Sequence, residues 1–99
     1  MAEAADIPRQ RLDKWLWHVR LQPTRSKAAA FIRDGYARIN GQRATDPAKP
    51  VRPGDVLTLA LHDRTIVIRV RHLLPARVGA PLAAGAYEPL SPQAPAPAV

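Results

Sequence analysis

The stretch that decides the fold is Arg11–Asn40, with the sequence RLDKWLWHVRLQPTRSKAAAFIRDGYARIN. Its first part predicts a short helix, because Leu12, Leu16 and Val19 recur at the spacing of one helical face. Pro23 lacks the backbone N–H that a continuing helix needs, so this helix ends before it. The stretch therefore predicts short, separate helices rather than one long amphipathic helix.

A second helix is predicted at about Arg25–Asp34. Thr24 can accept a hydrogen bond from an unpaired N–H at its start, and Gly35 can take the left-handed conformation that closes a helix. The inward face of this helix consists of Ala28, Phe31 and Ile32. Its first turn carries Arg25, Ser26 and Lys27. Unpaired N–H groups and the helix dipole favour an anion there, so two cations at this turn predict a phosphate site.

The distribution of charge points to a polyanionic partner. The 99 residues carry 15 Lys and Arg against 8 Asp and Glu, a net charge of +7. All the basic residues lie between Arg9 and Arg77, where only five aspartates oppose them, so this segment has a net charge of +10. A field of that sign attracts nucleic acid. A basic surface that serves only solubility is the alternative that charge alone leaves open.

Beyond Gly35 the pattern changes from helical to alternating. Ala37 and Ile39 share one face, whereas Tyr36, Arg38 and Asn40 share the other, which indicates a strand. Asn40-Gly41 is a tight-turn signal, because both residues tolerate positive φ. Two further strands are predicted at Val56–Leu61 and Thr65–Arg71, after a turn at Pro53–Asp55. Between the Asn40-Gly41 turn and the turn at Pro53–Asp55, Gln42–Pro53 is predicted to be a basic loop that carries Arg43, Lys49 and Arg52.

These elements predict one α+β domain, with two short helices packed on a small, mostly antiparallel sheet. We expect a flexible N-terminus at residues 1–8, the domain at residues 9–74 and a Pro/Ala-rich tail at residues 75–99. The prolines after Pro75 predict no helix or sheet of any length. We expect disorder at Leu90–Val99, and at best loose docking of Val78–Glu88.

Catalytic and metal chemistry have no motif in this sequence. The chain has no cysteine, which excludes disulfides and thiolate metal sites. His18, His62 and His72 match no metal-binding spacing, and we expect them to be ordinary surface histidines. There is no targeting segment and no apolar run of membrane-spanning length. We therefore expect a cytoplasmic protein that is not an enzyme and holds no metal or cofactor.

The two tryptophans lie on opposite sides of the first helix. Trp15 borders the apolar stripe and is expected in the core, whereas Trp17 is the more exposed ring. Trp17 could stack on a nucleobase, but packing on the sheet or on the tail is an equal alternative. A base-stacking platform needs several rings on one face. The sequence therefore favours recognition of RNA shape and phosphates.

The runs RLDKWLW, TRSKAAAFIRDG and YARINGQRA, followed by the turn at Pro53–Asp55, resemble the S4 RNA-binding domain, which has the alpha-L fold. Within that superfamily the chain is most similar to the bacterial fifteen-kilodalton heat-shock family, over roughly Arg9–Val70. The resemblance implies that the two helices, the following strand and the adjoining loop meet RNA. The implied contacts are Arg11, Lys14, Thr24, Arg25, Ser26, Lys27, Arg33, Arg38, Asn40, Arg43 and Lys49. Asn40 is equally well explained as a turn residue.

The resemblance also implies a partner. The heat-shock relatives bind the free large ribosomal subunit that still carries a nascent chain on transfer RNA, and small S4 relatives act in ribosome quality control. The partner that this resemblance implies is large-subunit ribosomal RNA, with peptidyl-tRNA as a second contact, and the chain is expected to be a monomer. The alternatives are a basic module for another RNA or an acidic protein, and an accessory of RNA modification. A pseudouridine synthase would need a catalytic domain that this chain has no residues to build.

Overall fold

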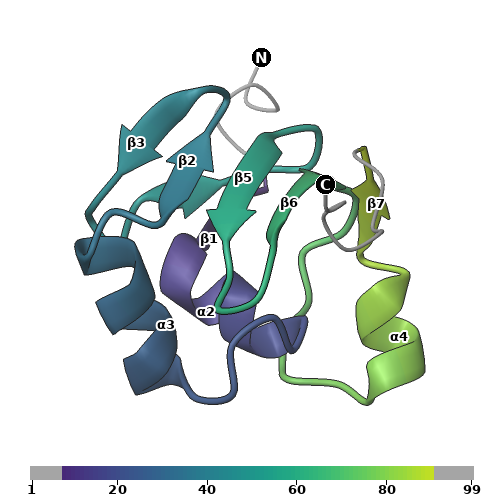
Figure 1. Cartoon of the computed structure of the whole chain (residues 1–99). Coiled ribbons are helices and arrows are strands. Elements are labelled where there is room, and N and C mark those ends of the chain that lie inside the picture. Colours follow the sequence, from purple (N-terminus) through teal and green to yellow (C-terminus); the bar gives the residue numbers. More distant parts are fainter. Residues whose placement is uncertain (1–7, 91–99) are drawn as a thin grey trace.

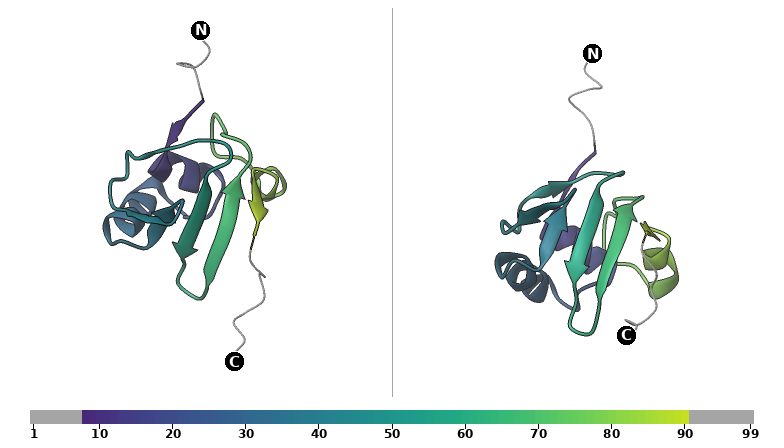
Figure 2. Two further views of the ribbon diagram at one scale, coloured as in Figure 1. Left: turned by 90° about the horizontal axis from the view of Figure 1, so that it is seen from above. Right: turned by 45° about the horizontal axis from the view of Figure 1, so that its top comes forward.

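A computed structural model describes residues 8–90, which form a sheet with helices on one face (Figure 1). The main sheet has five antiparallel strands in the order β3-β2-β5-β6-β7, and a separate two-stranded sheet pairs β1 with β4. Helix α2 lies beneath the centre of the main sheet, whereas α3 and α4 lie toward its two ends (Figure 2). The predicted α+β fold is therefore confirmed.

The two predicted helices are both present. Helix α2 covers Leu12–His18 and α3 covers Arg25–Arg33. At the end of α3, Asp34 is the C-cap, and Gly35 follows with φ of 87°. This left-handed backbone conformation explains why glycine stands at that position. The predicted bounds of the second helix are correct to one residue.

The hairpin after α3 has the predicted tight turn. Strand β2 covers Ala37–Ile39 and β3 covers Gln42–Ala44, and the turn residues Asn40 and Gly41 have φ of 51° and 85°. The predicted loop at Gln42–Pro53 is wrong in two places, because β3 and the short strand β4 (Pro50–Val51) both lie within it. Strand β4 pairs with β1 (Gln10–Arg11). A proline is tolerated here because this two-residue pairing stands apart from the main sheet.

The next two strands follow the predicted pattern. Strand β5 covers Val56–Ala60 and β6 covers Thr65–Val70, and every residue of β5 has a partner on β6. Alternate residues of both strands are buried under the sheet, while their neighbours face outward. This alternation divides the sheet into an apolar face toward the helices and a more polar outer face.

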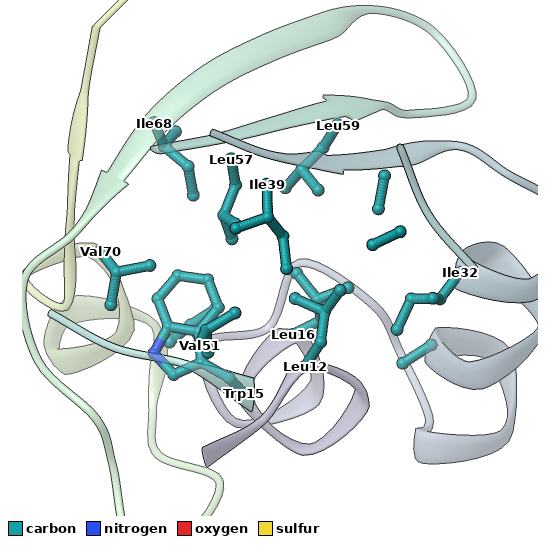
Figure 3. Packing of buried hydrophobic residues seen from close by; sticks show 14 of the residues in the cluster. Leu12, Trp15, Leu16, Ile32, Ile39, Val51, Leu57, Leu59, Ile68 and Val70 are labelled. Carbon is teal, nitrogen blue, oxygen red and sulfur yellow. The ribbon is translucent and has the colours of Figure 1, made fainter. Parts of the chain in front are cut away.

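The core lies between the sheet and the helices (Figure 3). Leu57 and Leu59 point from the sheet toward Leu12 and Leu16 of α2, and all four side chains are fully buried. The ring of Trp15 is also fully buried, as predicted, and its Nε1–H donates a hydrogen bond to the carbonyl oxygen of residue 72 at 2.9 Å. This bond fixes the chain that leaves β6 against α2.

The segment after Pro75 does form regular structure, so that prediction is wrong. Helix α4 covers Ala80–Ala84, and β7 (Tyr87–Pro89) pairs with β6. Ala83 and Ala86 are buried, so the segment contributes to the core. Proline is tolerated near the start of α4, where an N–H would have no partner within the helix, and at the end of a strand on the sheet edge. The expectations for residues 1–7 and 91–99 lie outside the described residues.

Candidate nucleic-acid interface

The first turn of α3 presents polar side chains to solvent. Thr24 has an extended backbone, and its Oγ1 accepts a hydrogen bond from the N–H of Lys27 at 3.0 Å, so it is the N-cap that the sequence predicts. Arg25, Ser26 and Lys27 are all exposed. The helix dipole adds positive potential at this end. This turn therefore stays our predicted phosphate site.

Asp13 joins the start of α2 to the start of α3. Its carboxylate is buried, and it accepts hydrogen bonds from Arg11 Nε at 3.0 Å, Arg11 Nη2 at 2.9 Å and the N–H of Lys14 at 2.7 Å. Arg25 Nε lies 3.8 Å from the same carboxylate. The hydrogen bond to Asp13 raises the pKa of Arg11 above its ordinary value. The carboxylate thus holds Arg11 and Arg25 close to one another and keeps both oriented.

The loop between β3 and β4 covers the first turn of α2. The N–H of Leu12 donates to the carbonyl oxygen of Lys49 at 2.9 Å, and the N–H of Asp13 donates to that of Pro47 at 3.1 Å. The first two backbone N–H groups of α2 therefore already have acceptors within the protein, so the N-terminus of α3 is the better site for an anion. The first of these hydrogen bonds also brings the backbone of Lys49 next to Leu12, and so close to Arg11 in the chain.

Arg38 and Arg43 form a second basic group on the outer face of the sheet. They stand directly opposite each other on β2 and β3, and both side chains are exposed. Like charges in this arrangement repel each other and weaken the strand pair. Neither guanidinium forms an ion pair within residues 8–90. Both are therefore available to bind a polyanion.

A hollow of about 210 Å³ adjoins this pair and is lined by Arg43, Lys49 and Arg52. Arg52 is a candidate contact that was not among the implied site residues, since its position in a proline-rich loop gave no indication of its neighbours. Asn40 also lines the hollow, but its Oδ1 accepts from the N–H of Val56 at 2.9 Å and its Nδ2 donates to Asp55 at 3.2 Å. These bonds explain Asn40 as a turn residue, and its contact with RNA stays a prediction.

One of the predicted contacts lies apart from these groups. Arg33 is exposed at the last turn of α3, at the opposite end of that helix from Lys27. Lys14 belongs to the helix starts, because its N–H binds the Asp13 carboxylate, although its side chain is partly buried. The remaining predicted residues therefore form two groups, one around the helix starts and one on the hairpin.

His18 is not a surface residue, so that prediction is wrong. Its side chain is 2% exposed, and its Nδ1 lies 2.8 Å from the carbonyl oxygen of Leu74. Burial is the main cause that lowers the pKa of His18, and nearby cations add to it. Periodicity could not reveal this burial, because the chain that covers His18 is more than 50 residues away in the sequence.

Trp17 packs against the C-terminal segment rather than standing free. The guanidinium carbon of Arg77 lies 5.8 Å from the centre of the Trp17 ring, and Arg77 Nη1 donates to the Trp17 carbonyl oxygen at 2.6 Å. A cation that lies over the face of an indole ring is attracted to the ring electrons. Of the alternatives that the sequence left open for Trp17, the structure favours packing on the tail.

Residues 8–90 contain no cluster of His, Cys, Asp or Glu that could hold a metal ion. None of the helices in this part of the chain is long and apolar enough to cross a bilayer.

Comparison with known proteins places this geometry in a family. The sequence model of the S4 domain matches residues 10–57. A solved structure described as trimeric Vibrio cholerae heat shock protein 15 superposes with a TM-score of 0.76 and 40% sequence identity, over 83% of this chain and 82% of that chain. The chain belongs to the heat shock protein 15 family of S4-domain proteins. The resemblance in the sequence motifs is thereby confirmed.

Curated relatives agree with this assignment. Heat shock protein 15 homolog of Aeromonas salmonicida is 40% identical over 78 residues, which are 79% of this chain and 58% of the relative. Heat shock protein 15 of Escherichia coli is 41% identical over 61 residues, which are 60% of this chain and 45% of that protein. The chain thus spans about half the length of these relatives. Small ribosomal subunit protein uS4 of Phenylobacterium zucineum is 31% identical over 58 residues, 59% of this chain and 28% of that protein.

The S4 match contains both basic groups of this family member. Residues 10–57 run from β1 into β5, and so include α2, α3 and the β2–β3 hairpin. Strand β6, helix α4 and strand β7 lie beyond the match, although they complete the sheet and the core.

Proposed function

We propose that this S4-domain protein binds structured RNA without catalysing a reaction, and that residues 9–74 carry the binding surface. We propose further that its partner is the ribosomal RNA of the large subunit, in the cytoplasm, during rescue or recycling of stalled subunits that carry peptidyl-tRNA. One observation carries the proposal. Exposed cations gather on α3 and on the β2–β3 hairpin, both inside the S4 match, without enough carboxylates nearby to neutralise them.

Phosphates are the natural ligands of these cations. Guanidinium and ammonium groups on a rigid helix and a rigid hairpin fix the position of a nucleic-acid backbone, which RNA recognition by shape requires. If five phosphates are neutralised, counterion release gives a log–log salt slope of about −3.5 for single-stranded RNA. Affinity should then fall about a hundredfold between about 50 and 200 mM salt.

The ribosomal part of the proposal rests on the relatives. Two groups of them carry the names heat shock protein 15 and small ribosomal subunit protein uS4. The large-subunit role comes from the heat-shock resemblance. We propose a monomer as the state of the free chain. The trimer described for the Vibrio cholerae protein is the alternative that sedimentation distinguishes.

The substitution Lys27→Glu tests the helix surface without weakening the fold. Residue 27 stands three positions after the N-cap Thr24, where a glutamate completes a capping box and suits the helix dipole. The variant should therefore be at least as stable as the wild type and yet bind purified large-subunit ribosomal RNA more weakly. Arg25→Glu combined with Lys27→Glu should abolish the binding.

The matched control is Arg64→Glu combined with Arg71→Glu. Both side chains are exposed and lie beyond the S4 match, so this control changes net charge equally. It should lose only the affinity that the general field of the protein supplies. Equal losses in the two double variants would contradict the proposed surface.

A gradient experiment tests the partner. Tagged protein is sedimented from cell lysate through sucrose, with and without translational stress, and RNA is crosslinked in the fractions that hold it. Enrichment with free large subunits after stress supports the rescue or recycling role. Migration at the top of the gradient with crosslinked RNA indicates another RNA partner, and migration there without crosslinks indicates an acidic protein partner.

A further inference from the structure

Tyr36 is an exposed aromatic residue on the turn that joins α3 to β2. Its side chain is 52% exposed, the largest exposure of any Phe, Trp or Tyr in residues 8–90. The backbone at Tyr36 is held on both sides, because its N–H donates to the Phe31 carbonyl oxygen at 3.3 Å and its carbonyl oxygen accepts from Ala60 at 2.9 Å. The ring therefore projects from a fixed point of the fold.

A second ring supports Tyr36. The ring centres of Phe31 and Tyr36 lie 5.8 Å apart at an interplanar angle of 40°, and Phe31 itself packs against the core. Contact with Phe31 leaves about half of the Tyr36 side chain open to solvent. One exposed ring on a rigid support is not a platform for several bases, but it has the shape to stack on a single base, and such stacking does not depend on which base is bound.

Two hollows in the surface meet at Tyr36. One has a volume of about 330 Å³ and is lined by Arg38, Arg43 and Thr58 in addition to Tyr36. The other has a volume of about 400 Å³ and is lined by Phe31, Gln22 and His62 in addition to Tyr36. Hollows of this size are within the range of small-molecule sites. Polar groups in both can form hydrogen bonds with the edge of a base.

The charge beside the ring suits a phosphate. Arg38 and Arg43 line the first hollow against a single carboxylate, that of Asp34. The side chain of Arg43 passes close to Gly35, because a Cβ added at Gly35 would lie 3.4 Å from Arg43 Cδ, an ordinary contact distance. The stem of Arg43 thus passes over the residue that precedes Tyr36. One ring and two cations therefore stand together at the junction of α3 and the hairpin.

We infer that Tyr36 stacks on an unpaired base of the bound RNA, while Arg38 and Arg43 bind phosphates of the same strand. This inference rests on the proposed function and deepens it, because it adds an unpaired nucleotide to a surface that otherwise recognises shape and phosphates. An acidic protein segment would use the two cations but would leave the ring without a partner. A nucleotide uses both, since every base has a flat face and every linkage carries a negative charge.

The test compares two RNA hairpins that share one stem and one compact tetraloop. The stem of the first is fully paired, and the stem of the second carries a single bulged 2-aminopurine, so that only the bulge distinguishes them. Tyr36→Leu removes the ring and keeps an apolar side chain, so it should weaken binding to the bulged hairpin by about 5- to 150-fold, the range for one stacked base. Binding to the paired hairpin should not change. Tyr36→Phe keeps the ring and should bind both RNAs as the wild type does.

Two further measurements separate stacking from charge. Quenching of 2-aminopurine fluorescence should accompany binding of the wild type and be lost in Tyr36→Leu. Arg38→Gln combined with Arg43→Gln should instead reduce the salt slope by about 1.4 to 1.8 on the bulged hairpin, whereas Tyr36→Leu leaves the slope as it is.

The outcomes distinguish this inference from the proposed function. If the wild type binds neither hairpin nor ribosomal RNA, the proposed function fails, and this inference fails with it. If the wild type binds RNA but Tyr36→Leu has no effect, or weakens both hairpins equally, only the stacking inference is overturned. Thermal denaturation of each variant verifies that the fold is intact. If Tyr36→Leu does not fold, the wild type decides the matter, because a bulged 2-aminopurine that is not quenched on binding overturns the stacking inference.

Discussion

The substitution Asp13→Asn tests how the helix starts are held together. The carboxylate of Asp13 is buried, receives the N–H of Lys14 at 2.7 Å and binds Arg11 through two hydrogen bonds, while Arg25 lies 3.8 Å away. Asparagine has nearly the same shape, but it carries no charge and replaces one acceptor oxygen by a donor N–H₂ group. The substitution therefore removes the electrostatic centre of this cluster and leaves its packing unchanged.

The expected loss of stability follows from the hydrogen bonds that the buried Asp13 carboxylate accepts. A hydrogen bond to a charged group contributes about 1.5–3 kcal/mol, of which a neutral acceptor retains about 1 kcal/mol. The new N–H₂ group would face the donors of Arg11, and a buried donor without an acceptor costs about 1 kcal/mol or more. The attraction between Arg11 and the carboxylate adds little, because the Arg11 side chain is 49% exposed and is screened by water. The net expectation is about 2 kcal/mol, or a fall in melting temperature of about 8–16 °C.

Thermal denaturation followed by circular dichroism measures this change, and urea denaturation at 25 °C verifies that the m-value stays constant. The matched control is Asp63→Asn, because the Asp63 side chain is 71% exposed and its nearest cation, on Arg64, is 3.9 Å away. We expect the control to change stability by less than about 0.5 kcal/mol. If Asp13→Asn is no more harmful than Asp63→Asn, the carboxylate does not hold the helix starts, and the reasoning is refuted.

Three further predictions concern the fold that supports the surface. Burial lowers the pKa of His18 below its ordinary value of 6.5, so the neutral ring stabilises the fold fully above pH 6.5, and this stabilisation is lost as the pH falls through the folded-state pKa. His18→Asn should make the free energy of unfolding less dependent on pH, as measured by urea denaturation above and below pH 6.5. Gly35→Ala should cost about 1 kcal/mol or more, because φ there is 87°, and a melting temperature equal to the wild type would contradict it. Trp15→Phe removes the buried N–H that donates to the carbonyl oxygen of residue 72, which should cost about 1 kcal/mol of stability in addition to the packing lost with the smaller ring. Nuclear magnetic resonance should show the largest chemical-shift changes in the chain after β6.

Local signals in the sequence predicted the parts of the fold that neighbours along the chain control. Thr24 is the N-cap, Gly35 closes α3 and the Asn40-Gly41 turn makes the hairpin, because capping and positive φ depend on a few adjacent residues. The alternation in β5 and β6 was equally clear, since one buried face imposes a period of two on the sequence. The first-turn residues of α3 could be predicted as a candidate site for the same reason.

Contacts between distant segments explain the errors. Strand β4 forms only because β1 lies beside it, and β7 forms only because β6 offers a free edge, so proline-rich composition alone gave the wrong answer for both. His18 is buried by the chain around Leu74, which no helical period can reveal. Tyr36 and Arg52 were missed as candidate contacts because their importance depends on the residues that line the same hollows.

The sequence by itself determined a basic α+β domain of the S4 type, with its first two helices, its hairpin turn and the positive charge of the segment that contains them. Charge, capping and periodicity are properties of single residues and short segments, and they can be read without coordinates. The tertiary structure alone decided which cations stand together, that Asp13 joins Arg11 to Arg25, and that Arg38 and Arg43 stand beside an exposed ring. These arrangements arise from packing between segments far apart in the chain, whose relative positions only the folded core fixes.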